Sequence, residues 1–272
     1  MANSLHFDGV DLSGSTYGVT LMKQRTQYPV MALPKIFSAS VAQRHGGFTY
    51  GGRGSARVIP VRVAVQGSSF SDLMDKVDAL NYLMAPENGE KSIRFDYISG
   101  RYWLGRLSNS IQAPPIGSTG FVLDWDFLCS NPNAYSTTQE TETITLVSNP
   151  QNGYLPLDFF SVIEGNVETF PVWKFKNTNA SDVTSITLEN TTTNQKITVT
   201  KTLQQNEYLK IDSQREAIEF STDDSTYTNV NEYRSNADKT FPTLDPQVSN
   251  TITITGITTG TCDCIYRARY RS

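Results

Sequence analysis

Apolar and polar residues alternate with a period of two along much of this chain, the pattern of strands that bury one face. In the first half the alternation runs through VIPVRVAV, SIRFDYI, RYWLGRLSNSI and GFVLDWDFLC. In the last of these segments the period places Asp124 and Asp126 on one face. The opposite, buried face is expected to hold Phe121, Leu123, Trp125, Phe127 and Cys129.

The second half shows the same alternation with turn residues between segments. The segments are FPVWKFKN, SDVTSITLENTT, QKITVTKTL, EYLKID, AIEFST, NTITITGI and CDCIYRARYR. Short strands that recur at roughly ten-residue spacing are typical of an antiparallel sandwich. The fold class is therefore predicted to be mainly β.

One segment of the first half has helical spacing instead. Ser69 is a candidate N-cap, and Asp72 stands three residues later as its capping-box partner. The helix is predicted at about 69–84 and should end before Pro86. Its apolar residues at helical spacing are Phe70, Leu73, Met74, Val77, Leu80, Leu83 and Met84.

Composition divides the chain near its middle. Only 5 of its 31 threonines precede residue 137, and the net charge of −4 splits into +2 for residues 1–136 and −6 for residues 137–272. We expect a first domain over 1–136, a linker or crossing segment over 137–169 and a β-sandwich over 170–272. The final strand either completes this sandwich or returns to the first domain.

Charge and cysteine content exclude several protein classes. A net charge of −4 lacks the basic excess of a nucleic-acid binder, and three cysteines are too few for a secreted disulfide framework. Asp8 and Asp11 interrupt the apolar core that a signal peptide would need. Arg62 breaks the apolar run around 58–65, far below the ~20 residues that span a bilayer, so we expect no membrane insertion.

The sequence contains no recognisable catalytic motif. The two histidines, His6 and His45, belong to no HExxH motif, and neither a GxSxG elbow nor a P-loop is present. The pairs Asp124/Asp126 and Asp223/Asp224 are better explained as solvated than as catalytic or calcium-binding carboxylates. We therefore predict no enzyme, no metal site and no cofactor.

The last strand and the aromatic residues of the second half offer weaker candidates. Cys262 and Cys264 are expected to be buried thiols, because zinc requires four suitably spaced ligands. The row of Arg267, Arg269 and Arg271 indicates a solvated face or a docking edge for an acidic partner. The candidate carbohydrate contacts, which would stack on sugar rings, are Trp173, Tyr208 and Tyr227.

The order of these segments resembles a known family. HFDGVDLS, the glycine-rich hairpin before RVIPVRVAVQGSS, the helix SFSDLMDKVDALNYLM, the FDYISGRYWLGRLS hairpin and FLCSNPNAYS are similar to the first domain of siphophage distal tail proteins. FPVWKFKNT, EYLKID and FPTLDPQVSNTITITG are similar to the second domain of that family. The resemblance implies an N-terminal β-sandwich or split-barrel domain with one helix, followed by a galectin-like or carbohydrate-module-like sandwich.

The resemblance also implies a structural function in the virion, at the distal end of the tail, for a protein made in the host cytoplasm. A homo-hexameric ring would join the tail tube protein and the tape-measure protein to the tail-tip or baseplate hub proteins, and DNA would only pass through its lumen. The alternative is a carbohydrate-binding module of an adhesion device. The hairpin expected to reach a neighbouring subunit contains Arg44, His45, Gly46, Gly47, Phe48, Tyr50, Gly51, Gly52 and Arg53.

Overall fold

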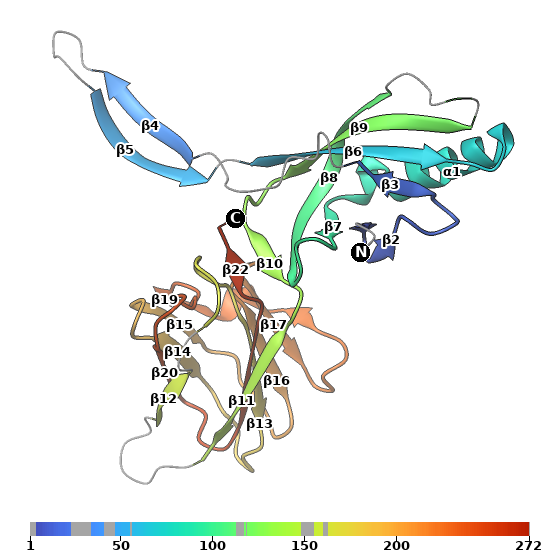
Figure 1. The fold of residues 1–272 in the computed structure, drawn as a ribbon. Helices are drawn as coiled ribbons and strands as arrows, with labels where there is room; N and C mark the ends of the chain where they lie inside the picture. Colours follow the sequence, from blue (N-terminus) through green and yellow to red (C-terminus); the bar gives the residue numbers. More distant parts are fainter. Residues whose placement is uncertain are drawn as a thin grey trace. The chain divides into compact units, whose positions relative to one another are not determined.

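The computed structural model describes residues 4–22, 34–40, 47–54, 56–112, 117, 119–147, 155–159 and 163–271. The chain folds as two compact units (Figure 1). Unit 1 runs from the N-terminus to Thr137 and includes Arg271, and unit 2 runs from Thr138 to Tyr270. Within the described residues, no helix is both long and apolar enough to cross a bilayer.

In its described residues, unit 1 consists of antiparallel strands and one α-helix, as the alternating pattern and the helical spacing predicted. Its main sheet has the order β2-β1-β7-β8-β9-β6-β3. In addition, β10 pairs with the N-terminal end of β8. The strands are β1 (Leu5–Phe7), β2 (Val10–Asp11), β3 (Val19–Leu21), β4 (Pro34–Ser40), β5 (Gly47–Gly54), β6 (Arg57–Gln66), β7 (Lys91–Phe95), β8 (Arg101–Gln112), β9 (Gly120–Cys129) and β10 (Ala134–Ser136).

This sheet curves so that its two ends approach each other. Leu12, which is fully buried, donates its backbone N–H to Leu5 O of β1 at 3.0 Å and accepts from Val19 N of β3 at 2.9 Å. A sheet that closes on itself in this way encloses one core. That core includes the stacked rings of Phe7 and Phe127, whose centroids are 5.8 Å apart.

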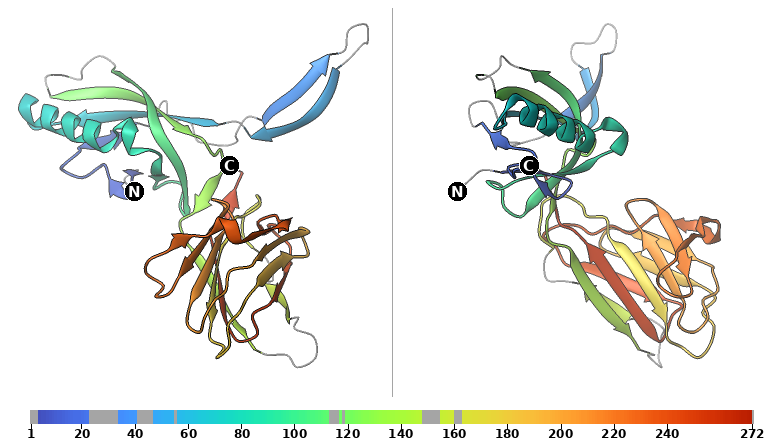
Figure 2. Two further views of the ribbon diagram at one scale, coloured as in Figure 1. Left: turned by 180° about the vertical axis from the view of Figure 1, so that it is seen from behind. Right: turned by 90° about the vertical axis from the view of Figure 1, so that its right-hand side faces the viewer.

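The predicted helix is α1 (Phe70–Leu83), which lies alongside β6 (Figures 1 and 2). Ser69 is its N-cap and accepts a hydrogen bond from Asp72 N at 3.1 Å. The Asp72 carboxylate accepts from Ser68 N at 2.6 Å, one residue before the donor expected of a capping box. A 3-10 turn, η1 (Pro86–Asn88), follows the helix at the proline that was expected to stop it.

Strand β9 departs from the expected one-sided alternation. Trp125, Phe127 and Cys129 are buried, but the buried residue at the other end of the strand is Val122 instead of Leu123. The neighbouring β8 shifts register between Leu107 and Asn109. The shift is a local irregularity of the ladder, and strict alternation could not anticipate it.

Unit 2 consists of two antiparallel sheets. One has the order β11-β21-β13-β16-β17-β18, and the other has the order β12-β20-β14-β15-β19. A short 3-10 turn, η2 (Asn231–Tyr233), precedes β19. The strands are β11 (Glu140–Leu146), β12 (Leu155–Phe159), β13 (Val172–Asn177), β14 (Ile186–Asn190), β15 (Gln195–Val199), β16 (Tyr208–Asp212), β17 (Ala217–Ser221), β18 (Thr228–Asn229), β19 (Arg234–Lys239), β20 (Asn250–Thr255) and β21 (Gly260–Tyr266). The last strand of the chain, β22 (Arg269–Tyr270), belongs to neither of these sheets.

Side chains from both sheets of unit 2 meet in a single apolar core. Trp173 and Phe175 of β13 enter it from one sheet, and Leu188 of β14 and Ile252 of β20 enter it from the other. All four are 0 % exposed. Two sheets that share a core in this way form a β-sandwich, so the predicted fold class is confirmed for this half as well.

The segment 137–169, expected to be a linker, instead contains two strands of unit 2. β11 pairs with β21 over its whole length, and β12 pairs with β20. The linker was expected because threonine content and charge change near residue 137 and because SNPQNGYLPLDFF and GNVETFP contain Asn, Gly and Pro. An edge strand needs only one buried face, and Leu146 together with the half-buried Ile144 supplies it.

Candidate functional site

The residues expected to contact a neighbouring subunit belong partly to β5. Arg44, His45 and Gly46 lie outside the described residues. In the described part of the chain, β5 pairs with β4 alone, and the ladder runs from Pro34↔Gly54 to Ser40↔Gly47. The residues of the predicted contact that β5 contains are Gly47, Phe48, Tyr50, Gly51, Gly52 and Arg53.

Trp173 is not a carbohydrate contact. Its side chain is 0 % exposed in the core of unit 2, and its indole Nε1 donates to Pro242 O at 3.4 Å. The prediction failed because Trp173 stands in the FPVWKFKN alternation with Phe175, on the face that the sandwich buries. A ring in this position cannot stack on a sugar.

Tyr208 and Tyr227 are half-buried and lie close to lysines. Lys174 Nζ and Lys176 Nζ are 5.5 and 5.4 Å from the Tyr208 ring centroid, and Lys210 Nζ is 4.8 Å from that of Tyr227. These distances are those of cation–π contacts. Ammonium groups thus already occupy positions at both rings, which leaves less aromatic surface for a sugar.

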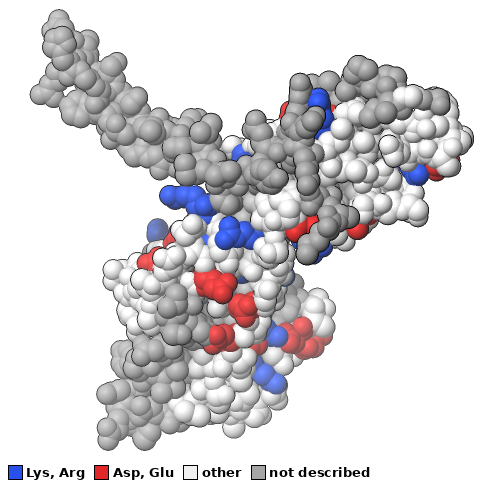
Figure 3. Space-filling view, in the orientation of Figure 1, with Lys and Arg blue, Asp and Glu red and all other residues white. Residues whose placement is uncertain are grey.

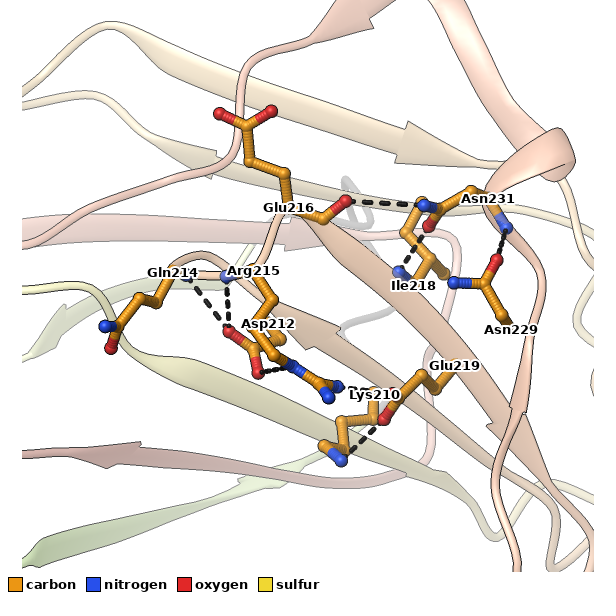
Figure 4. Close-up of polar contacts among 9 residues, drawn as sticks. All are labelled: Lys210, Asp212, Gln214, Arg215, Glu216, Ile218, Glu219, Asn229 and Asn231. Carbon is orange, nitrogen blue, oxygen red and sulfur yellow. Dashed lines mark hydrogen bonds and ion pairs between the residues drawn. The ribbon is translucent and has the colours of Figure 1, made fainter. Parts of the chain in front are cut away.

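Next to these tyrosines, the β16–β17 hairpin carries an ion-pair network that the sequence analysis missed (Figure 4). Asp212 accepts from Gln214 N and Arg215 N at 3.0 and 2.9 Å and from Arg215 Nε at 2.8 Å. Arg215 also pairs with Glu219, whose other oxygen accepts from Lys210 Nζ at 2.6 Å. The signal was available in the sequence as opposite charges spaced to face each other across a hairpin.

The network is internally neutralised. Partial burial raises the pKa of Glu219, but the hydrogen bonds from Lys210 and Arg215 outweigh burial and leave that pKa below its usual value. The same bonds to Asp212 and Glu219 raise the pKa of Arg215. Figure 3 shows acidic and basic side chains next to one another on the displayed face of unit 2. The network therefore stabilises the hairpin and offers no unpaired charge to a ligand.

Asp223 and Asp224 were considered above as calcium ligands or catalytic acids. Both carboxylates accept hydrogen bonds from neighbouring groups of unit 2. Asp223 accepts from Ser225 N and Thr226 N at 2.9 and 3.1 Å, and with the bond from Ser225 Oγ these hold its pKa far below the usual range. Asp224 accepts from Lys174 Nζ at 2.6 Å and from Tyr227 Oη at 2.5 Å. Both carboxylates therefore have structural partners.

All three cysteines are free and buried, as predicted for Cys262 and Cys264. Burial raises the pKa of both thiols well above its ordinary value, and burial together with Glu90 raises the pKa of Cys129 to about 12. Thiols in this state are poor nucleophiles and poor metal ligands. No cluster of histidine, cysteine, aspartate or glutamate suited to a metal occurs in the described part of the chain.

Arg269 does not belong to an exposed basic row. The side chain is 7 % exposed, its Nη1 donates to Glu168 O at 2.7 Å, and its guanidinium lies 4.7 Å from the Phe170 ring centroid. The regular strand β21 ends at Tyr266, so the alternation extrapolated through Arg267 and Arg271 is interrupted. Through these two contacts, Arg269 fixes the segment 163–170 to the last strand segment of unit 2.

Family models match both halves of the chain. The model of the phage tail protein RIFT-related domain matches residues 12–123, and the model of the siphovirus-type tail component, C-terminal domain, matches residues 164–270. The two matches together define a siphophage tail component, with one domain type in each half. The chain belongs to the distal tail (Dit) protein family of these phages, a family of structural tail and baseplate hub proteins.

Solved structures show the same fold. The crystal structure of the SPP1 Dit protein (gp 19.1), described as a paradigm of the hub of the adsorption apparatus in phages that infect Gram-positive bacteria, matches with a TM-score of 0.73 and 16% identity over 99% of each chain. A chain of the phage P2 baseplate in its activated conformation with Ca matches with a TM-score of 0.58 and 10% identity over 98% of each chain. No curated protein sequence matches this chain.

Proposed function

We propose that six copies of this chain form a ring at the distal end of the tail. The ring joins the tail tube and tape-measure proteins to the proteins of the tail tip or baseplate. Its lumen lets DNA pass during infection, and the role requires no catalysis. The observation that carries this proposal is the pair of family matches, which assigns a tail-component domain to each half of the chain.

The structure of β4 and β5 supports an assembly. A two-stranded hairpin is at best marginally stable in water, and both of its outer edges can pair with another chain. In the described part of the chain β4 and β5 pair only with each other. Contacts in which one subunit reaches the next in a head-to-tail manner close into rings when the rotation allows it.

The sugar-binding alternative is weaker. Trp173 is buried in the core and cannot contact a sugar, and Tyr208 and Tyr227 are half-buried rings beside lysines. A structural role for unit 2 does not require that any of these aromatic rings be accessible to a ligand. We therefore propose the ring alone.

The absolute mass of the purified protein tests the ring directly. Light scattering across a concentration series should detect a species of six 30.2 kDa chains, about 181 kDa, or twice that mass for two stacked rings. Negative-stain images of the same fractions should show sixfold symmetry. A monomer at every concentration, both alone and with the tail tube protein added, would contradict the proposal.

A further inference from the structure

The connection between α1 and β7 contains an asparagine that is followed directly by a glycine. Asn88 is the last residue of η1, Gly89 comes next, and both residues are exposed. A Cβ atom built at Gly89 would meet no atom within 4 Å, so the space around this residue is open. Glycine also has no side chain that could shield its backbone nitrogen. An amide side chain and an unshielded backbone nitrogen are therefore adjacent on the surface of unit 1.

The turn that contains these two residues is held by few bonds. η1 has three residues, and no side chain caps its N-terminus. Asn88 N donates to Ala85 O at 3.0 Å, and Gly89 N donates to Pro86 O at 3.2 Å. A 3-10 turn of this length has poor hydrogen-bond geometry, and an exposed turn opens at a small cost in free energy. Opening releases Gly89 N and lets the Asn88 side chain rotate toward it.

We propose that Asn88 is a site of spontaneous deamidation. Gly89 N attacks Cγ of Asn88, a bond forms between these two atoms, and the bond from Cγ to Nδ2 breaks. The hydrogen of Gly89 N goes to the leaving group, which departs as ammonia, and a succinimide ring remains. Water then opens the ring at one of its two carbonyl carbons and returns a hydrogen to Gly89 N. The product is aspartate or isoaspartate in place of Asn88, with one more negative charge.

The Asn88 amide contributes to the end of α1, so its loss has a structural effect. Nδ2 of Asn88 donates to Tyr82 O at 3.3 Å, and this oxygen is one of the last carbonyls of the helix. Such carbonyls have no partner within the helix. An ionised carboxylate only accepts hydrogen bonds and cannot donate to this oxygen. Conversion therefore exchanges a favourable contact for repulsion between two oxygens.

The local charge makes the product still less favourable. No lysine or arginine occurs between Lys76 and Lys91, whereas Asp78, Glu87 and Glu90 lie in that stretch. The last turn of α1 and the turn η1 contain no basic residue. The C-terminal end of a helix carries a partial negative charge, so an added anion is unfavourable there. We expect the last turn of α1 to fray in the modified chain.

The change proceeds in one direction, because the ammonia is lost to the solvent. The chain belongs to a family of structural phage-tail proteins, and a protein that has been built into a particle is not replaced by new synthesis. We therefore expect the modified fraction to increase with the age of the particle. This expectation holds whether or not the proposed ring forms.

Peptide mapping of the full chain tests the modification. The purified protein is incubated for several weeks in mildly alkaline buffer, digested and analysed by mass spectrometry. The peptide that contains Asn88 should gain about 1 Da and separate into aspartate and isoaspartate forms. Digestion also distinguishes Asn88 from Asn152, the other asparagine that precedes a glycine. Asn206 is the internal reference, because it is exposed in a turn but is followed by Glu207, and it should remain an amide.

The variant Asn88→Gln is the matched control for the chemistry. Glutamine keeps the amide, but its ring closure includes one more atom, so we expect ammonia loss at least about tenfold slower. Conversion of the natural chain together with its absence in Asn88→Gln supports the proposal. An Asn88 that stays an amide in the folded chain, while a synthetic peptide of residues 84–93 converts, would overturn it because the fold would then protect the site. Conversion of Asn206 as rapid as that of Asn88 would overturn it as well, since exposure alone would then govern the reaction.

Two further variants measure the effect on α1. Asn88→Ala removes the amide donor, and Asn88→Asp also adds the charge of the product. We expect the Tm of unit 1 to fall in the order natural chain, Asn88→Ala, Asn88→Asp, and the difference between the two variants to shrink as salt rises. Asn206→Asp adds the same charge in unit 2 and should leave the Tm of unit 1 unchanged. An Asn88→Asp variant as stable as the natural chain would overturn the role of this amide at the end of α1.

Discussion

At the residue scale, the acidic side chains of unit 2 divide by what they contact. Asp223 and Asp224 close a turn or bind Lys174, and both have a lowered pKa. Glu142 lies in the row of β11 that also holds Ile144, and partial burial with Glu140 nearby raises its pKa. Carboxylates of the first kind stabilise the fold when ionised, whereas Glu142 destabilises it when ionised.

Because Asp223 and Asp224 have a lowered pKa, we expect unit 2 to lose stability in acid. A carboxylate whose pKa is lower in the folded state contributes stability above its unfolded pKa, near 3.8 for Asp223, and loses it as pH falls below that value. The free energy of unfolding should therefore decrease as pH falls from about 5 to 3. Urea unfolding at a series of pH values, followed by tryptophan fluorescence, measures this decrease.

The variant Asp223→Asn should be less stable than the natural chain at pH 7, and the gap should narrow toward pH 3. The matched control is Asp182→Asn, which removes an exposed aspartate and should change neither value. Equal stability of the natural chain and Asp223→Asn at pH 7 would show that the hydrogen bonds to Asp223 contribute nothing to stability.

At the scale of single elements, the start of α1 depends on one hydroxyl. Ser69 accepts from Asp72 N, and the Asp72 carboxylate in turn binds Ser68 and Lys76. These bonds satisfy backbone donors that a helix start leaves without partners. The cap therefore fixes where α1 begins.

Replacing the cap therefore has a defined cost. We expect Ser69→Ala to lower the stability of unit 1 by about 1 kcal/mol, the usual value for a lost N-cap. Ser71→Ala is the matched control, because Ser71 is exposed and lies within the helix, so its effect should be much smaller. Chemical denaturation monitored by circular dichroism compares the two, and equal effects would contradict the capping role.

Elements differ in how far the sequence could predict them. The helix was found because its cap and its spacing are local, and local patterns survive in the fold. The strand β11 was missed because its pairing with β21 joins residues 120 positions apart, such as Thr143 and Asp263. Trp173 was assigned to a sugar site because its aromatic character was considered without its place in the FPVWKFKN alternation, which puts it on the same face as Phe175. The Asp212–Arg215–Glu219 network likewise depends on a hairpin register that alternation alone does not set.

At the scale of the whole molecule, two units with separate cores suggest two unfolding events. Unit 2 has a contiguous chain from Thr138 to Tyr270 and encloses its own apolar core. Its sheets are formed by strands of that segment. The sequence indicated this division through threonine content and charge.

A fragment of residues 138–270 should therefore fold alone. We expect cooperative unfolding, with a Tm within about 5 °C of the matching transition in the full chain, the shift that about 1 kcal/mol causes in a unit of this size. Differential scanning calorimetry of both proteins provides the comparison. A fragment that remains unfolded would show that residues outside 138–270 complete the core of unit 2.

The burial of every cysteine has a practical consequence for a protein of a virus particle. Cys129, Cys262 and Cys264 are enclosed in the cores and are protonated at physiological pH. Oxidants and thiol reagents act on accessible thiolates, so we expect the three cysteines of the folded protein to remain free thiols in reducing and in oxidising media. A single cysteine introduced on the surface would consequently be the one thiol that a maleimide dye could label, which opens the assembly to fluorescence measurements without removal of the natural cysteines.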